Sequence, residues 1–217
     1  MRRPIHLDSL FSFFLLLLIC AESFGQVEED AVKNDQPDYY YDVLGSVKIG
    51  MLFPKPYGEN ALSEAYDTGN GIQLEAKVQV NHKLGVGLQY QVFKGQVTDQ
   101  IVVGGVDASR IAHVFALFGI NHLKLKSPWR LETDFGVGYL EFRNERGPII
   151  EFKDTGLTLK LSASLSYRFN SWIGAYIQVQ YNWGFLSIDT PDISEIRDVL
   201  NRTTLFAPSF GLRFYVL

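Results

Sequence analysis

Apolar and polar residues alternate with a period of two along several stretches of this chain. At 72–80, Ile, Leu, Ala, Val and Val alternate with Gln, Glu, Lys and Gln. At 157–168, six apolar or aromatic residues alternate with Thr, Lys, three Ser and Arg. Successive side chains of a strand point to opposite faces of a sheet, so each stretch forms a strand with one apolar face. The alternation predicts an all-β protein.

The first residues have the layout of a secretory signal peptide. Two arginines precede an apolar run at 10–19, and Ser23 and Gly25 follow at the −3 and −1 positions of a cleavage site. The run is shorter than the roughly 20 residues of a spanning helix. We therefore expect a signal peptide over 1–25. The alternatives are an uncleaved anchor and lipoprotein processing at Cys20.

The composition of the mature chain excludes several classes of protein. The leader holds two basic and two acidic residues, so the net charge stays at −4 after cleavage, which argues against a nucleic-acid binder. Cys20 is the only cysteine, so no disulfide framework is expected. Strands that cross a membrane dilute their apolar residues with polar ones, so a modest hydropathy is compatible with a membrane barrel.

The alternation gives eight candidate strands joined by unequal connections. The expected strands are 45–53, 71–81, 84–93, 110–121, 129–142, 156–169, 172–181 and 204–216. Tight or modest links alternate with long ones, the long ones being 54–70, 94–109, 143–155 and 182–203. Short periplasmic turns and long outer loops are typical of transmembrane barrels. The sequence predicts an eight-stranded antiparallel up-and-down transmembrane β-barrel over 44–217, after a flexible periplasmic extension at 26–43.

The last strand carries a resemblance to known membrane barrels. The segment 209–217 reads SFGLRFYVL, with an aromatic face typical of an assembly signal. It resembles the C-terminal strand of OmpA/OmpX-like barrels, although it ends in Leu rather than Phe. Together with GSVKIG at 45–50, it also resembles the PorT-like barrels of Bacteroidetes-type bacteria. The residues of the expected assembly signal are Phe210, Gly211, Phe214, Tyr215 and Leu217.

The resemblance has consequences for location and partners. It implies insertion by the barrel-assembly machinery into the cell outer membrane, where lipid and lipopolysaccharide would surround a monomer. The rival fold is a soluble, exported barrel of lipocalin type with its apolar face inward. The aromatic last strand and aromatic residues near strand ends, such as Trp129 and Tyr139, favour the membrane barrel.

In a membrane barrel the polar faces of the strands line the lumen. The charged residues expected there are Lys48, Glu75, Lys77, Arg130, Glu132, Asp134, Lys160, Arg168 and Arg213. Eight strands leave an interior that side chains just fill, and an unpaired charge in it is costly. We expect the carboxylates to pair with Lys and Arg and to plug the lumen. An ion path or a binding pocket is the alternative.

The residues offer little support for an enzyme. His113 lies within a strand and lacks the serine two residues away that lipid A deacylases carry. Arg130 makes ion pairing the plainer role for Glu132 and Asp134. No metal-ligand spacing and no cofactor motif is apparent. The OmpA/OmpX resemblance implies a structural or loop-mediated role. A secretion accessory of PorT type, a lipid A-modifying enzyme and a soluble ligand-binding barrel remain alternatives.

Overall fold

The computed structural model describes residues 43–81, 83–100, 105–121, 128–146, 149–187 and 201–216. The predicted signal peptide lies outside these residues, as does the predicted extension up to residue 42. Leu217 of the expected assembly signal and most of the expected outer loop at 182–203 also lie outside them.

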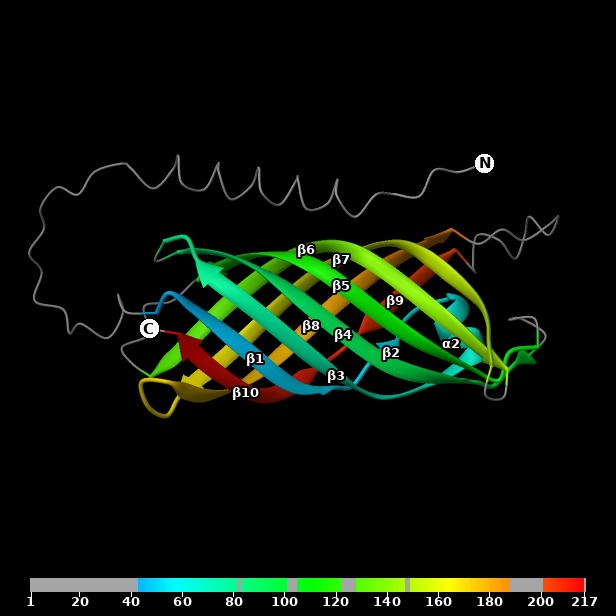
Figure 1. Cartoon of the computed structure of the whole chain (residues 1–217), viewed down its shortest axis with the longest axis horizontal. Coiled ribbons are helices and arrows are strands. Elements are labelled where there is room, and N and C mark those ends of the chain that lie inside the picture. The colour runs from blue at the N-terminus through cyan, green and yellow to red at the C-terminus, as the bar shows by residue number, and fades with distance from the viewer. Residues whose placement is uncertain are drawn as a thin grey trace, which may run out of the picture. The chain divides into compact units, whose positions relative to one another are not determined.

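The described chain is built almost wholly of antiparallel strands. Its elements are β1 (Gly45–Leu52), β2 (Lys55–Pro56), α2 (Ala61–Ala65), β3 (Tyr66–Gln79), β4 (Leu84–Val97), β5 (Ala108–Asn121), β6 (Trp129–Arg146), β7 (Ile149–Arg168), β8 (Ile173–Ser187), β9 (Arg202–Phe206) and β10 (Ser209–Val216). In the order β1, β3 to β8 and β10, each strand pairs with the next, and β10 also pairs with β1. These strands therefore close a ring of eight, which confirms the predicted barrel (Figure 1).

Prolines stand where the first and last wall strands are interrupted, and only the last of these strands was predicted to be continuous there. The strand expected at 204–216 is split into β9 and β10 by Pro208, and Pro54 separates β1 from β2. Proline has no N–H to donate to a ladder. The two interruptions lie side by side, because the Phe53 N–H donates to the Pro208 carbonyl at 2.9 Å. Beyond them, β2 pairs with β9 toward the end of the barrel where α2 lies.

Most strands continue farther than the alternation predicted. Pairing of β6 with β7 runs to Arg146 opposite Ile149, so most of the loop expected at 143–155 is strand. β8 likewise runs to Ser187. In the extension of β6 both faces carry polar residues, such as Arg143 outside and Asn144 inside. The apolar–polar alternation therefore stops before the backbone pairing does.

The direction of the side chains distinguishes a membrane barrel from a soluble one. Outward residues such as Ile177 are 60% exposed, whereas the inward Arg213 is 0% exposed. The outward apolar band covers about nine residues of β4, from Leu84 to Val92, close to what a tilted strand needs to cross a bilayer. A soluble lipocalin-type barrel would have the opposite arrangement, so that alternative is wrong.

Aromatic residues flank the apolar band on its outer surface. Trp129 and Tyr167 meet edge to face at 4.8 Å near the turn ends of β6 and β7, and Tyr181 meets Trp183 at 4.6 Å on β8. Such aromatic rings are typical of membrane interfaces. Strict alternation would turn Trp172 inward, but it is exposed because it lies in the turn before β8. Among the described residues, no helix is long and apolar enough to span a membrane.

A charge placed on the outward band is expected to destabilise the barrel. Leu161 on β7 is 52% exposed and lies in the band between the outward Leu159 and Ala163. In a bilayer, Leu161→Arg should lower the free energy of unfolding by about 2–4 kcal/mol, because the guanidinium enters hydrocarbon. Urea unfolding in phospholipid vesicles measures this, with Leu161→Ala as the control. Equal stabilities of the arginine and alanine variants would contradict an outward lipid face.

Candidate functional site

Six of the nine expected lumen residues form one ion network inside the barrel. It comprises Lys48 on β1, Glu75 and Lys77 on β3, Glu132 and Asp134 on β6, and Arg213 on β10. Arg213 binds Glu132 with two parallel bonds, Nη1 to Oε2 at 2.8 Å and Nη2 to Oε1 at 2.7 Å. Both side chains are almost fully buried, so this bidentate pair is cut off from water.

The two lysines connect the carboxylates of the ion network. Lys48 Nζ lies 2.9 Å from Glu75 Oε1 and 3.4 Å from Glu132 Oε2. Lys77 bonds Asp134 and lies 3.6 Å from Glu75 and 3.8 Å from Glu132. Lys48 stands directly opposite both Glu75 and Arg213 in the strand register. Alternation on neighbouring strands therefore brings these residues to one level of the lumen.

A glycine makes room for one pair of the ion network. At Gly119 on β5, a Cβ atom would lie 2.6 Å from the Asp134 carboxylate and 2.9 Å from Lys77 Nζ. Any side chain there would push the pair apart. Gly119 was not among the expected site residues, and its signal in the sequence is a glycine at an inward position of β5 opposite Asp134.

The other three expected lumen residues make different contacts, to an amide and to aromatic rings. Lys160 donates to Gln89 Oε1 at 2.5 Å and lies 5.9 Å from the Phe115 ring centroid. In the described part of the chain no carboxylate comes within ion-pair distance of it. Arg130 and Arg168 lie over the ring of Tyr215, at 5.4 and 4.8 Å from its centroid. These two arginines lie at the end of the lumen that faces the short turns.

Next to the ion network is a belt of amide side chains. It comprises Gln73, Gln89, Gln91, Gln178, Gln180 and Asn182, all buried. Gln91 Nε2 donates to Gln89 at 2.9 Å and to Gln180 at 2.8 Å, and Gln89 Nε2 donates to Glu75 at 3.2 Å. The belt therefore links the strands across the lumen and joins the ion network by hydrogen bonds.

Toward the end that holds α2, buried apolar side chains form a cluster, called the plug, that was not expected from the sequence. The plug comprises Leu52, Leu62, Ala65, Tyr66, Phe93, Ile111, Leu140, Phe142, Leu186, Leu205 and Ala207. Its one available signal was the strand expected at 110–121, which is apolar on both faces. The inward Ile111 and Phe115 of that strand are fully buried.

The short helix α2 supplies part of the plug from a segment expected to be loop. Asn60 caps the helix, accepting the N–H of Leu62 at 3.0 Å, while the hydroxyl of Ser63 accepts the N–H of Asn60 at 3.0 Å. This reciprocal pair satisfies backbone donors of the first turn. The cap fixes Leu62 in the plug, where it is 0% exposed.

His113 lies between the amide belt and the plug without a polar partner. Its ring stacks on Phe93 at 6.1 Å and on Phe115 at 5.5 Å. Among the described residues neither ring nitrogen has a hydrogen-bond partner. A general base needs a proton donor within reach and a group that orients it. His113 has neither in this part of the chain, and its ring packs between Phe93 and Phe115.

Replacing His113 by phenylalanine is expected to keep or raise stability. The ring stack would be preserved, and two buried nitrogens without partners would be removed, a gain of about 1 kcal/mol. Urea unfolding in vesicles measures the change, with His113→Ala as the control that leaves a cavity. A large loss of stability in His113→Phe would show that the imidazole makes an essential polar contact.

A polar chain of four residues lies beside the plug near the outer end. The Tyr66 and Ser109 hydroxyls are 2.9 Å apart, Ser109 donates to Asn144 at 2.5 Å, and Asn144 donates to Asp154 at 2.8 Å. Burial raises the pKa of Asp154, and the hydrogen bond from Asn144 partly offsets this rise. The chain ties β3, β5, β6 and β7 together at the rim.

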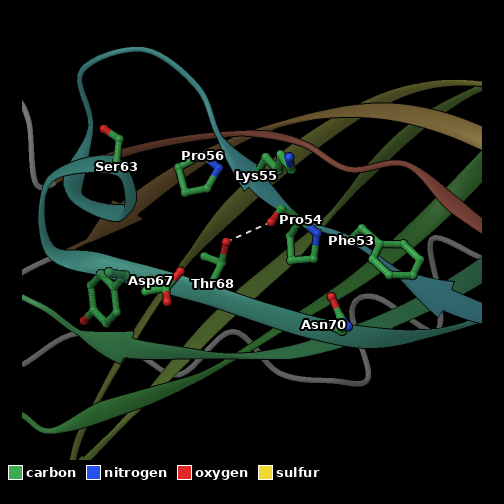
Figure 2. A pocket seen from close by; sticks show the side chains of 9 residues that line it. Phe53, Pro54, Lys55, Pro56, Ser63, Asp67, Thr68 and Asn70 are labelled. Carbon is green, nitrogen blue, oxygen red and sulfur yellow. Dashed lines mark hydrogen bonds between the residues drawn. The ribbon is translucent and has the colours of Figure 1, made fainter.

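The wall has a crevice of about 430 Å³ where β2 and β3 face each other (Figure 2). Its β2 side is lined by Phe53, Pro54, Lys55 and Pro56, and its β3 side by residues that include Asp67, Thr68 and Asn70. The Thr68 hydroxyl bridges the two sides by donating to the Pro54 carbonyl at 2.8 Å. No cluster of three or more metal-ligating side chains occurs among the described residues.

The sequence matches no protein-family model and no curated protein. The fold matches solved structures of small outer-membrane proteins. Neisserial surface protein A aligns with a TM-score of 0.60 at 15% identity, over 79% of this chain and 97% of that one. OprG from Pseudomonas aeruginosa aligns with a TM-score of 0.51 at 14% identity, over 80% and 97%.

A third similar structure comes from another bacterium. A major outer membrane protein from Thermus thermophilus aligns with a TM-score of 0.51 at 14% identity, over 79% of this chain and 98% of that one. These likenesses show the fold, that of the small outer-membrane β-barrels predicted from the sequence. The fold and the outward apolar band agree with the predicted location in the cell outer membrane.

Proposed function

We propose that this chain is a non-enzymatic structural barrel of the outer membrane whose lumen is filled and carries no solute flow. The observation that carries the proposal is the sequence of side-chain layers inside the barrel. From the short-turn end outward, arginines around Tyr215, the ion network, the amide belt and the apolar plug follow one another. An eight-stranded barrel has little room beyond such side chains.

The proposal of a non-enzyme rests on the buried polar groups. The carboxylates Glu75, Glu132 and Asp134 each form a buried ion pair with lysine or arginine. His113 stacks on two aromatic rings, a poor setting for a catalytic base. The barrel would act through its lipid-facing wall and its outer end, as a monomer inserted by the barrel-assembly machinery.

Deletion of the gene with complementation tests this function. We expect the deletion strain to admit more of a hydrophobic dye through its outer membrane and to keep unchanged lipid A by mass spectrometry. Wild type and His113→Phe should restore the barrier equally. An altered acyl pattern of lipid A that wild type restores and His113→Phe does not would support a lipid-modifying enzyme instead.

The same deletion strain distinguishes the structural barrel from a PorT-like secretion accessory. A PorT-like accessory would lose secretion of exported proteins on deletion, with an intact dye barrier. If the barrel also co-purified with a secretion complex, a role in secretion would replace the proposed structural role. A dye defect with normal secretion is the result that the structural barrel predicts.

A further inference from the structure

Four basic side chains form a row across the outward face of β4, β5, β6 and β7. The register sets Lys94 directly opposite Arg110, Arg110 opposite Arg143, and Arg143 opposite Lys153. Each alternates with an inward neighbour, so all four project from the outer surface. Lys94, Arg110 and Lys153 are exposed, and Arg143 is half-buried. We call these four residues the basic row.

The basic row is electrostatically unfavourable in the isolated barrel. Like charges directly opposite each other on one sheet face repel and destabilise the pairing. Arg110 has a basic neighbour on each side. In the described part of the chain, two carboxylates reach the row, Glu145 at 3.7 Å from Lys94 and Glu141 in contact with Arg143. Four positive charges thus meet two negative ones, and a further anion would offset the surplus.

The basic row lies just outside the apolar band. The neighbouring outward residues on the membrane side are Val92 on β4 and Ala112 on β5, followed by Glu141 on β6 and Thr155 on β7. Tyr90 on β4 and Tyr139 on β6 face outward four residues farther toward the membrane than the row, and both pair with Val114 of β5. Tyrosine is enriched where the hydrocarbon meets the lipid headgroups. The basic row therefore lies beyond these tyrosines, on the side that holds the outer rim, where headgroup phosphates would be within reach of its cations.

We propose that the basic row binds the phosphate groups of lipid A in the outer leaflet. This inference rests on the proposed place of the barrel in an outer membrane. Arginine forks match phosphate oxygens bidentately, and lysines add point charges on either side. A phosphate placed at Arg110 would face three cations at once, and it would turn the repulsion along the row into attraction.

Binding to purified barrel in neutral maltoside micelles tests the inference. The probes are bis-phosphorylated lipid A and the same lipid with its phosphates removed, and native mass spectrometry counts the bound lipid. We expect Arg110→Gln to weaken binding of the phosphorylated lipid about fivefold, the contribution of one cation near a charged lipid surface. Lys83→Gln removes an exposed charge at the opposite, short-turn end and should change nothing.

Two further readouts separate binding from a purely structural role. Without lipid A, Arg110→Gln should unfold at the same temperature as wild type or higher, because it relieves two repulsions. The double variant Glu141→Gln, Glu145→Gln should bind phosphorylated lipid A more tightly. Equal binding of both lipids, or Arg110→Gln binding like Lys83→Gln, would overturn the inference. A loss of stability of Arg110→Gln in lipid-free micelles would also overturn it. None of these readouts depends on whether the lumen conducts.

Discussion

Replacing Glu132 by alanine is expected to lower the free energy of unfolding by about 3–5 kcal/mol, because the substitution leaves buried cations without their counter-charge. Glu132 binds both Nη atoms of Arg213 and lies 3.4 Å from Lys48. Without it, Glu75 and Asp134 alone would face the lysines and Arg213. Urea unfolding in phospholipid vesicles, followed by tryptophan fluorescence, measures the change.

A second substitution and a surface control sharpen this prediction. Adding Arg213→Met to Glu132→Ala should recover part of the lost stability, since Lys48 and Lys77 then again match Glu75 and Asp134 in charge. Glu141→Ala breaks a pair on the outer surface of the same strand and should have a much smaller effect. If Glu132→Ala and Glu141→Ala lost equal stability, the buried network would not be a source of the barrel's stability.

Truncation of Phe115 to alanine should cost about as much, about 3–5 kcal/mol, because the large ring is fully buried and leaves a cavity in the lumen. The substitution removes a ring stacked on His113 and lying beneath Lys160. The matched control is Phe118→Ala on the same strand, whose ring faces outward and is 48% exposed. Lipid chains fill the space that the control leaves, so its loss should be much smaller.

The comparison between Phe115 and Phe118 also tests which side of the wall is packed. An open water-filled lumen would make the two truncations similar in cost. Equal losses, measured by the same urea unfolding, would contradict a tightly filled lumen. A larger loss at Phe118 would mean that the outer surface packs against protein rather than lipid.

The sequence predicted the parts of this fold that are set by local alternation. A period of two assigns Lys48, Glu75 and Lys77 to one face wherever the opposite face meets lipid. Their mutual contact then follows from closing a narrow ring. The barrel, its strand number and the members of the ion network could therefore be read from residues a few positions apart.

The parts that were missed depend on contacts between distant segments. At the plug, inward residues such as Ile111 are apolar, as are outward residues of the same strands. The alternation of apolar and polar residues therefore disappears there. In the outer extension of β6, Arg143 and Asn144 are polar on both faces and resemble a loop. The expected partner of Lys160 was a carboxylate, but the amide of Gln89 reaches it first. Only the three-dimensional register decides such choices.

Conductance of the purified barrel in a planar lipid bilayer tests the central claim most directly. The filled lumen predicts that the wild-type barrel inserts without discrete current steps, at any voltage that the bilayer tolerates. Insertion is checked independently by the slower migration of the unfolded, boiled protein on a gel. Discrete steps from wild-type barrel that change size in Glu132→Ala or Phe115→Ala would show an ion path through the lumen and contradict the account.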